Sequence, residues 1–390
     1  MSDFRNCGGY VRPFLTFKPI MNMYTSNPID KELWLLLKSK YQIRRICNNF
    51  IRQRRNLAGN RLSSICDEFS AFLKQAENYF NAASTLPWNS SPLLYYYSFL
   101  NLAKAIIILY HDLPSNATHG LSYHARSGWF ALKKQIIVSN NNTNGIFPLL
   151  YNTITGRAIN STNLPINQLL SYITDIQMQY NTLKLGISRN IPCLCAIGEH
   201  LRQRAWLIFM VPKPLKLEYR WPFSQQFRRD FELVEVNDRN IHIAYHQIGQ
   251  IFNLSVPEVG GFNIYQSRNE HPWLPNGKRP TQQLFDSLMR SLGPYIEEKC
   301  FPGDFDLKLN LPFRITGHSG WILMNEFLSS YAIMFYLGML VRYHPEILDK
   351  IENRKEKWLF ESFVMSIRNS FLRRVVSHIF NAMVILKRIE

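Results

Sequence analysis

The chain has 390 residues, 46% of them hydrophobic, and a formal charge of +17 at neutral pH. This apolar content suits one large domain or two domains with buried cores, and it excludes a disordered chain. The positive charge favours nucleic acid, an acidic protein or an anionic membrane as a partner over a neutral small molecule.

Residues 28–56 are predicted to form one long basic helix. Pro28 stands at its start, Asp30 lies near its positive end, and large apolar residues recur at helical spacing. No acidic residue occurs between Glu32 and Asp67. The interval therefore has no local counter-ion, which leaves two interpretations: a solvated helix face, or a surface that contacts a polyanion. The predicted nucleic-acid contacts are Arg44, Arg45, Arg52, Arg54 and Arg55.

Periodicity predicts further elements along the chain. Helical spacing continues over residues 65–84 and 92–110, and a short helix is expected within residues 163–186. Short β-branched and aromatic runs then predict strands at 205–212, 215–221, 231–236, 240–248 and 304–315, before helices return from Trp321 to the end.

This order of elements predicts an α+β fold that is mainly α. We expect an N-terminal helical region at residues 1–190, a strand-rich insert at 191–318, and C-terminal helices at 319–390 that complete one bundle with the N-terminal helices.

Several features bear on location and cofactors. The six cysteines are scattered and the first residues do not resemble a secretion signal, so we expect free thiols and a cytoplasmic protein. The apolar tract Trp321 to Val341 contains Asn325 and Glu326, which favours a core helix over a membrane span. His242 and His246 lack a cysteine or carboxylate at ligand spacing, so no metal or cofactor is predicted.

The run "YYYSFLNLAKAIIILY" (residues 95–110) is followed by "THGL" (118–121). Helical spacing would bury one aromatic face of this run, with the tyrosine hydroxyls reaching the surface. Alternatively, Tyr96, His119 and His124 line a cleft. The order of residues is similar to the helix pair of higher-eukaryote and prokaryote nucleotide-binding (HEPN) domains, which predicts such a pair over residues 92–130.

A longer resemblance is to the bacterial YaaC-like family. Its members combine a segment similar to residues 95–121 with a later apolar helix that ends in an Arg-Tyr-x-Pro turn, here Arg342, Tyr343 and Pro345. That family has no settled activity, so this resemblance implies a fold and leaves the chemistry open.

The HEPN resemblance implies a candidate chemistry. Ribonucleases of that superfamily use an Arg-x4-His motif without metal, usually in a dimer, and "RRVVSH" places Arg373 and His378 at this spacing. Histidine can exchange a proton near neutral pH, and arginine can stabilise charge on a phosphate. On a helix Arg373 and His378 point about 140° apart, whereas Arg374 shares the face of His378, so either arginine is a candidate.

Two functions follow as expectations. The first is an RNA-binding, metal-independent ribonuclease that acts as a homodimer, as the effector of an anti-phage or toxin-like system. The second is a non-catalytic scaffold or binding subunit that contacts nucleic acid or an acidic protein partner.

Overall fold

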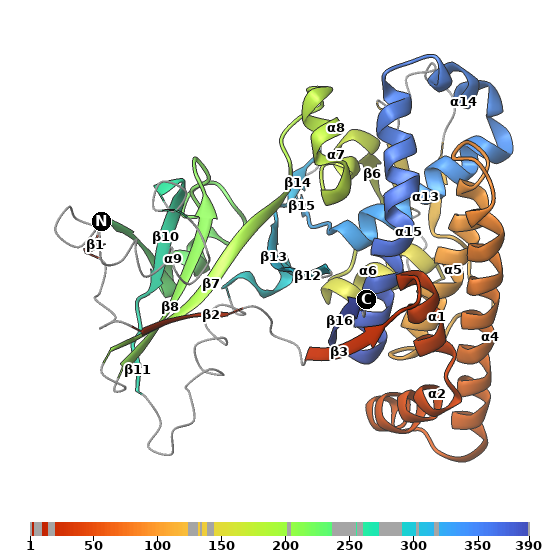
Figure 1. Cartoon of the computed structure of the whole chain (residues 1–390), viewed down its shortest axis with the longest axis horizontal. Coiled ribbons are helices and arrows are strands. Elements are labelled where there is room, and N and C mark those ends of the chain that lie inside the picture. The colour runs from red at the N-terminus through yellow and green to blue at the C-terminus, as the bar shows by residue number, and fades with distance from the viewer. Residues whose placement is uncertain are drawn as a thin grey trace. The chain divides into compact units, whose positions relative to one another are not determined.

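The computed structural model describes residues 2–3, 10–14, 20–123, 132, 135–138, 144–200, 204–235, 255, 260–272, 291–301, 304–315 and 320–388. The chain divides into two compact units (Figure 1). The first unit contains residues 1–17 and 191–312, and the second contains residues 18–190 and 313–390.

The first unit is built on one sheet. The order of its described strands is β1-β9-β10-β8-β7-β13-β12, with β2 paired to β7 and β11 paired to β8. These strands are β1 (Ser2–Asp3), β2 (Tyr10–Phe14), β7 (Asn190–His200), β8 (Arg204–Pro212), β9 (Phe231–Glu235), β10 (Phe262–Ser267), β11 (His271–Pro272), β12 (Ile296–Phe301) and β13 (Asp304–Asn310). Residues 205–211 of β8 are buried on both faces, and helix α9 (Ser224–Asp230) brings the Phe227 ring to 6.2 Å from Phe209.

Most of the predicted strands in this region that fall on described residues are confirmed, and one is wrong. β8, β9 and β13 occupy predicted runs, whereas residues 215–221 form turns. β10 already pairs with both β8 and β9, so this segment adds no strand between them. Its polar backbone groups bond to side chains of β10 instead: Asn263 donates to the Leu215 carbonyl, and the Leu217 amide donates to the Tyr265 hydroxyl. The predicted strand 240–248, with His242 and His246, lies outside the described residues.

The second unit is mainly helical. Its helices are α1 (Ile29–Lys38), α2 (Lys40–Ile46), the π-helix η1 (Cys47–Ile51), α3 (Arg52–Arg55), α4 (Gly59–Ser84), α5 (Pro92–Ile108), α6 (Ile146–Thr155), α7 (Ile166–Leu170), η3 (Thr174–Ile176), α8 (Gln177–Thr182), α13 (Glu326–Tyr343), α14 (Pro345–Glu352) and α15 (Glu356–Phe380). Small sheets accompany them: β3 (Ile20–Thr25) with β16 (Met383–Arg388), β14 (Phe313–Arg314) with β15 (Trp321–Ile322), and β4 (Leu121–Tyr123), β5 (Gln135–Val138) and β6 (Thr162–Pro165).

Helix α5 lies at the centre of this unit, against α4, α13 and α15 (Figure 1). The Phe99 ring of α5 stacks on Phe371 of α15 with a centroid distance of 3.6 Å, and Phe371 lies 4.5 Å from Phe327 of α13. Residues 326–338 of α13 are all buried, so the apolar tract forms a core helix as predicted. Among the described residues, no helix is both long and apolar enough to cross a membrane.

Two helix predictions are corrected. Residues 28–56 do not form one helix, because Ser39 adopts an extended ψ of 121° between α1 and α2, and a π-helix follows α2. The break lets α1 and α2 each pack against α4. The described part of the predicted pair, residues 92–123, contains one helix: α5 ends at Ile108 and Leu121–Tyr123 is a strand. The helix that pairs with α5 in sequence is α4, on its N-terminal side.

The cysteine prediction is correct for one pair and wrong for another. Cys193 and Cys195 are buried thiols. Cys47 and Cys66 instead form a disulfide between η1 and α4, with their Cα atoms 6.0 Å apart. This separation is typical of disulfides, and the packing of η1 on α4 that produces it is not visible in the spacing of the cysteines along the chain.

Gly120 fixes the loop between α5 and β4. Its φ is +71°, and a Cβ atom there would lie 2.5 Å from Cδ of Pro148 and 2.8 Å from Cα of Gly145. Next to it, the Thr118 amide donates to the Asn144 carbonyl. A side chain at position 120 would therefore force this loop away from the start of α6.

Replacing Gly120 by alanine should destabilise the protein more than the same change at Gly156. Both glycines have a positive φ, which costs alanine about 1 kcal/mol, but a Cβ at Gly156 meets no atom within 4 Å. Urea unfolding should thus give a clearly lower midpoint for Gly120→Ala than for Gly156→Ala. Equal midpoints would show that the close approach to Pro148 carries no cost.

Candidate functional site

The predicted basic segment presents an exposed surface along α2, η1 and α3. Arg44, Arg45 and Arg52 are exposed, while Ile46 and Ile51 are buried and hold the segment on the core. Among the described residues, none of these three arginines forms an ion pair. Their charges therefore remain available to a polyanion.

A shallow open hollow lies on the same segment. It is lined by Asn48, Asn49, Arg52 and Asn56. Asn48 and Asn49 follow Arg44 and Arg45 by four residues, and Asn56 ends α3 in the left-handed conformation, with a φ of 49°. Asparagine amides can both donate to and accept from a base edge. Sequence reasoning missed these asparagines, although the i, i+4 spacing to the arginines was a usable signal. We call the exposed side chains Arg44, Arg45, Asn48, Asn49, Arg52 and Asn56 the α2–α3 surface.

Arg55 differs from the other arginines of the segment. Only 7% of its side chain is exposed, it donates to the Ile108 carbonyl at the end of α5 (2.8 Å), and it forms an ion pair with Asp112. Hydrogen bonds from Arg55 and the nearby charges of Arg55 and Arg61 lower the pKa of Asp112. Asp112, which is distant in the sequence, therefore neutralises part of the positive charge of the basic segment. Arg54 belongs to α3, and its side chain lies outside the described residues.

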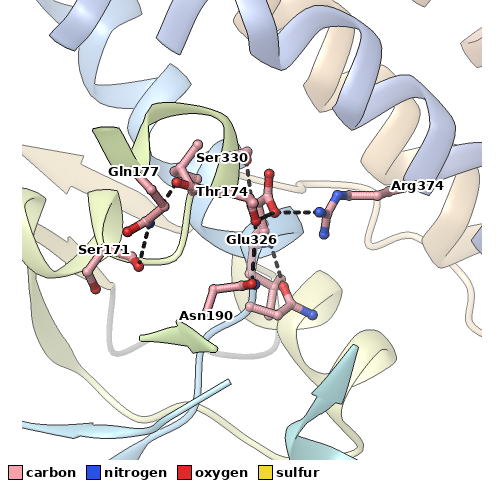
Figure 2. Close-up of polar contacts among 10 residues, drawn as sticks. Ser171, Thr174, Gln177, Asn190, Glu326, Ser330 and Arg374 are labelled. Carbon is pink, nitrogen blue, oxygen red and sulfur yellow. Dashed lines mark hydrogen bonds and ion pairs between the residues drawn. The ribbon is translucent and has the colours of Figure 1, made fainter. Parts of the chain in front are cut away.

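Arg374 is enclosed by a buried polar network (Figure 2). Its Nη2 atom donates to Oε2 of Glu326 at 2.6 Å, and the Thr174 hydroxyl donates to the same oxygen at 2.8 Å. Glu326 is fully buried and Arg374 is 8% exposed. Burial lowers the pKa of Arg374 to about 10, and the charge of Asp175 acts in the opposite direction, so Arg374 stays protonated at neutral pH.

This network joins three parts of the second unit. Glu326 begins α13, where Asn325 caps the helix by accepting from the Leu328 amide at 2.9 Å. Thr174 lies in η3 and also approaches Asn190 at 3.4 Å. The Arg374–Glu326 pair thus ties α15 to α13 and to the segment between α7 and β7, which is a structural role for the second candidate catalytic arginine.

Arg373 and His378 lie on the same helix as Arg374. Both are partly exposed, whereas residues 374–376 between them are buried. The imidazole of His378 lies 5.3 Å from the Phe327 ring, centroid to centroid. Ser377, also partly exposed, follows Arg373 by one turn and adjoins His378 in sequence. We call the partly exposed side chains Arg373, Ser377 and His378, which together span about 140° of the helix, the accessible strip of α15.

Tyr96 and His119, two of the predicted cleft residues, are in contact. The Tyr96 hydroxyl lies 2.6 Å from Nδ1 of His119. Tyr96 is 4% exposed and its ring packs edge-on against Tyr331 and Phe335 of α13, whereas His119 is exposed. Burial raises the pKa of Tyr96 far above its ordinary value, so its hydroxyl stays protonated. His124 lies outside the described residues.

Within the described parts of the chain, no group of three or more histidine, cysteine, aspartate or glutamate side chains could hold a metal ion. The α2–α3 surface, the accessible strip of α15 and the loop at His119 offer positive charge, amides and imidazoles, which are ligands of phosphate and of nucleobases.

A model of the YaaC-like protein family matches residues 35–379. The chain belongs to the YaaC-like family. This match covers the α2–α3 surface, α5, α13 and almost all of α15. No curated protein and no solved structure matches the chain. The family assignment therefore supports the fold of this YaaC-like protein without naming a reaction.

Removing one partner of the buried ion pair should destabilise this YaaC-like protein strongly. Arg374→Ala leaves the Glu326 carboxylate buried without its cation, and loss of one partner of such a pair costs about 3–5 kcal/mol. Replacing both residues by leucine should recover part of this loss. Chemical unfolding monitored by circular dichroism measures the difference.

Lys357→Ala is the matched control for this measurement, because it breaks an exposed ion pair with Glu352. Exposed pairs contribute little, so this variant should unfold like the unmodified protein. If Arg374→Ala were as stable as Lys357→Ala, the network would not hold α15 in place.

Proposed function

We propose that this YaaC-like protein binds RNA through the α2–α3 surface and cleaves it without metal through Arg373 and His378. The observation that carries the binding step is the set of exposed arginines on this surface, which are free of ion pairs within the described residues. Phosphate contacts by arginine position a nucleic acid, and amides read base edges. The hollow lined by asparagines beside Arg52 supplies both kinds of contact.

Support for cleavage comes from the accessible strip on α15. A ribonuclease of this type needs a group that takes the 2′-hydroxyl proton and a cation for the phosphate charge. His378 and Arg373 offer these groups, but on a helix they point about 140° apart. A homodimer that joins two α15 helices would bring an arginine of one copy to a histidine of the other. The alternative is a non-catalytic RNA-binding or scaffold subunit, which uses the α2–α3 surface alone.

Charge reversal on the α2–α3 surface should weaken RNA binding. The triple variant Arg44→Glu, Arg45→Glu, Arg52→Glu should lose about tenfold or more in affinity for a single-stranded RNA, because phosphate contacts supply most of such binding. The slope of log affinity against log salt should fall by about 2, since each contact contributes about 0.7. Fluorescence anisotropy at several salt concentrations measures both.

The matched control reverses three exposed lysines of the same unit, Lys74, Lys350 and Lys355, which changes the net charge equally. Binding that depends only on net charge would weaken alike in both triple variants. That result would remove the α2–α3 surface as the RNA site.

Cleavage should persist in EDTA and depend on α15. We expect the unmodified protein to cut RNA and leave 2′,3′-cyclic phosphate ends, and His378→Ala and Arg373→Ala each to lower the rate by about 100-fold or more, with RNA affinity retained. His344→Ala, a partly exposed histidine outside α15, is the control. Intact RNA with the unmodified protein, under conditions where it binds, would favour the non-catalytic alternative.

A further inference from the structure

A second cluster of basic and hydroxyl side chains lies along α5, where this helix contacts α4 and α13. It contains Lys104 and Tyr97 of α5, Arg342 of α13, and His119 of the loop before β4, and we call it the His119 cluster. Helices α5 and α13 are in contact at Gly338, where an added Cβ would lie 3.4 Å from Cβ of Tyr96, an ordinary van der Waals distance. The proposed function uses none of these side chains.

His119 is exposed and yet held at two points. Nδ1 contacts the buried Tyr96 hydroxyl at 2.6 Å, and the backbone carbonyl of His119 accepts from the Phe147 amide at 3.1 Å. The neighbouring Gly120 can hardly be replaced, because Pro148 leaves no room for a Cβ. An exposed side chain ordinarily keeps its rotamer freedom, so this ring is positioned in advance. The bond at Nδ1 directs Nε2 to another partner.

Two cations accompany the imidazole. Arg342 is exposed, and its Nη1 atom donates to the Tyr97 hydroxyl at 3.2 Å. Lys104 is partly buried, with its ammonium 5.4 Å from the centre of the Phe72 ring of α4. Neither cation forms an ion pair with any described residue. Their charges thus lack a direct counter-ion.

The charges in this region act on one another. Burial lowers the pKa of His119, and the positive charges of Lys104 and Arg342 lower it further. Burial also lowers the pKa of Lys104, while the carboxylate of Glu68 on α4 raises it. Glu68 is therefore the acid that moderates the cluster, and it acts on Lys104 from a distance without an ion pair. These effects favour the neutral imidazole over the protonated one.

We propose that Lys104, His119 and Arg342 form a phosphate-binding site. A phosphate group has several oxygens and more than one negative charge, so it can accept from donors that come from three separate segments. Arg342 supplies a planar fork of N–H donors, Lys104 an ammonium, and His119 its Nε2. A phosphate of the RNA backbone and the phosphate of a free nucleotide share this chemistry. The site itself does not depend on the proposed function.

Binding has a specific consequence at His119. A bound phosphate adds negative charge beside the imidazole, which favours its protonated form and raises its pKa. In the full-length protein labelled with ¹⁵N-histidine, NMR should show a higher pKa for His119 in inorganic phosphate than in chloride of equal ionic strength. His119→Gln assigns the resonance. An unchanged pKa would overturn the proposal.

The variants test which cations hold the phosphate. Arg342→Ala and Lys104→Ala should each weaken phosphate binding by about tenfold, since each removes a charge-assisted hydrogen bond. Lys74→Ala, on the exposed face of α4, should bind as the unmodified protein does. Arg342 is exposed, so its variant keeps the test valid even where Lys104→Ala disturbs folding. Equal weakening by Lys74→Ala and Arg342→Ala would indicate a general charge effect and overturn the site.

Two further titrations identify the source of the phosphate. A nucleoside 5′-monophosphate that shifts His119 equally in the unmodified protein and in the Arg44→Glu, Arg45→Glu, Arg52→Glu variant supports a free nucleotide as ligand. A shift caused by an RNA oligonucleotide alone supports a backbone phosphate. No shift with either probe overturns the proposal. The NMR shift of His119 is measured independently of RNA affinity. Failure of the RNA-binding proposal can therefore be distinguished from failure of the phosphate site.

Discussion

The ion pair between Glu326 and Arg374 is the constraint on which the arrangement of the second unit depends. A fully buried carboxylate is costly unless its cation stays beside it, so α13 and α15 must keep one relative rotation. Thr174 donates to the same oxygen, so the segment before β7 is also joined to this ion pair. Because Arg374 turns inward, Arg373 lies about 100° away at the edge of the buried face, whereas His378 is only about 40° from Arg374 and its ring lies beside the buried Phe327. The pair therefore decides which side chains of this helix can meet a ligand.

The basic residues of the chain divide into two groups with different physical roles. Arg55 and Arg374 are largely buried, and each is satisfied by an acid that lies far along the sequence. Arg44, Arg45 and Arg52 are exposed and meet no acid among the described residues. The second group retains its charge for a polyanion, whereas the neutralised and desolvated cations of the first group contribute to the fold. The net charge of +17 therefore overstates the positive charge that is available to a polyanion.

Local pattern predicted much of the fold, because helical and strand periodicity express burial at the scale of one element. It predicted α5, the core helix α13 and strand β8. Local pattern could not predict contacts between segments that are far apart in the sequence. The sequence around Arg55 does not indicate that Asp112 neutralises this arginine, and the sequence around Arg374 does not indicate its pairing with Glu326. The helix break at Ser39 is not marked by a glycine or a proline.

His378 and His119 differ in whether one copy of the chain supplies the partner residues that each histidine needs. His378 and Arg373 diverge around α15, so acid–base chemistry on one phosphate requires a second copy to supply the missing partner. His119 has Lys104 and Arg342 within electrostatic reach in the same copy, and its ring is already fixed by Tyr96. If both proposals hold, phosphate binding at His119 would need one copy of the chain, whereas cleavage by α15 would need two copies and would therefore depend on protein concentration. The phosphate site would then be able to hold a strand before two α15 helices meet around it.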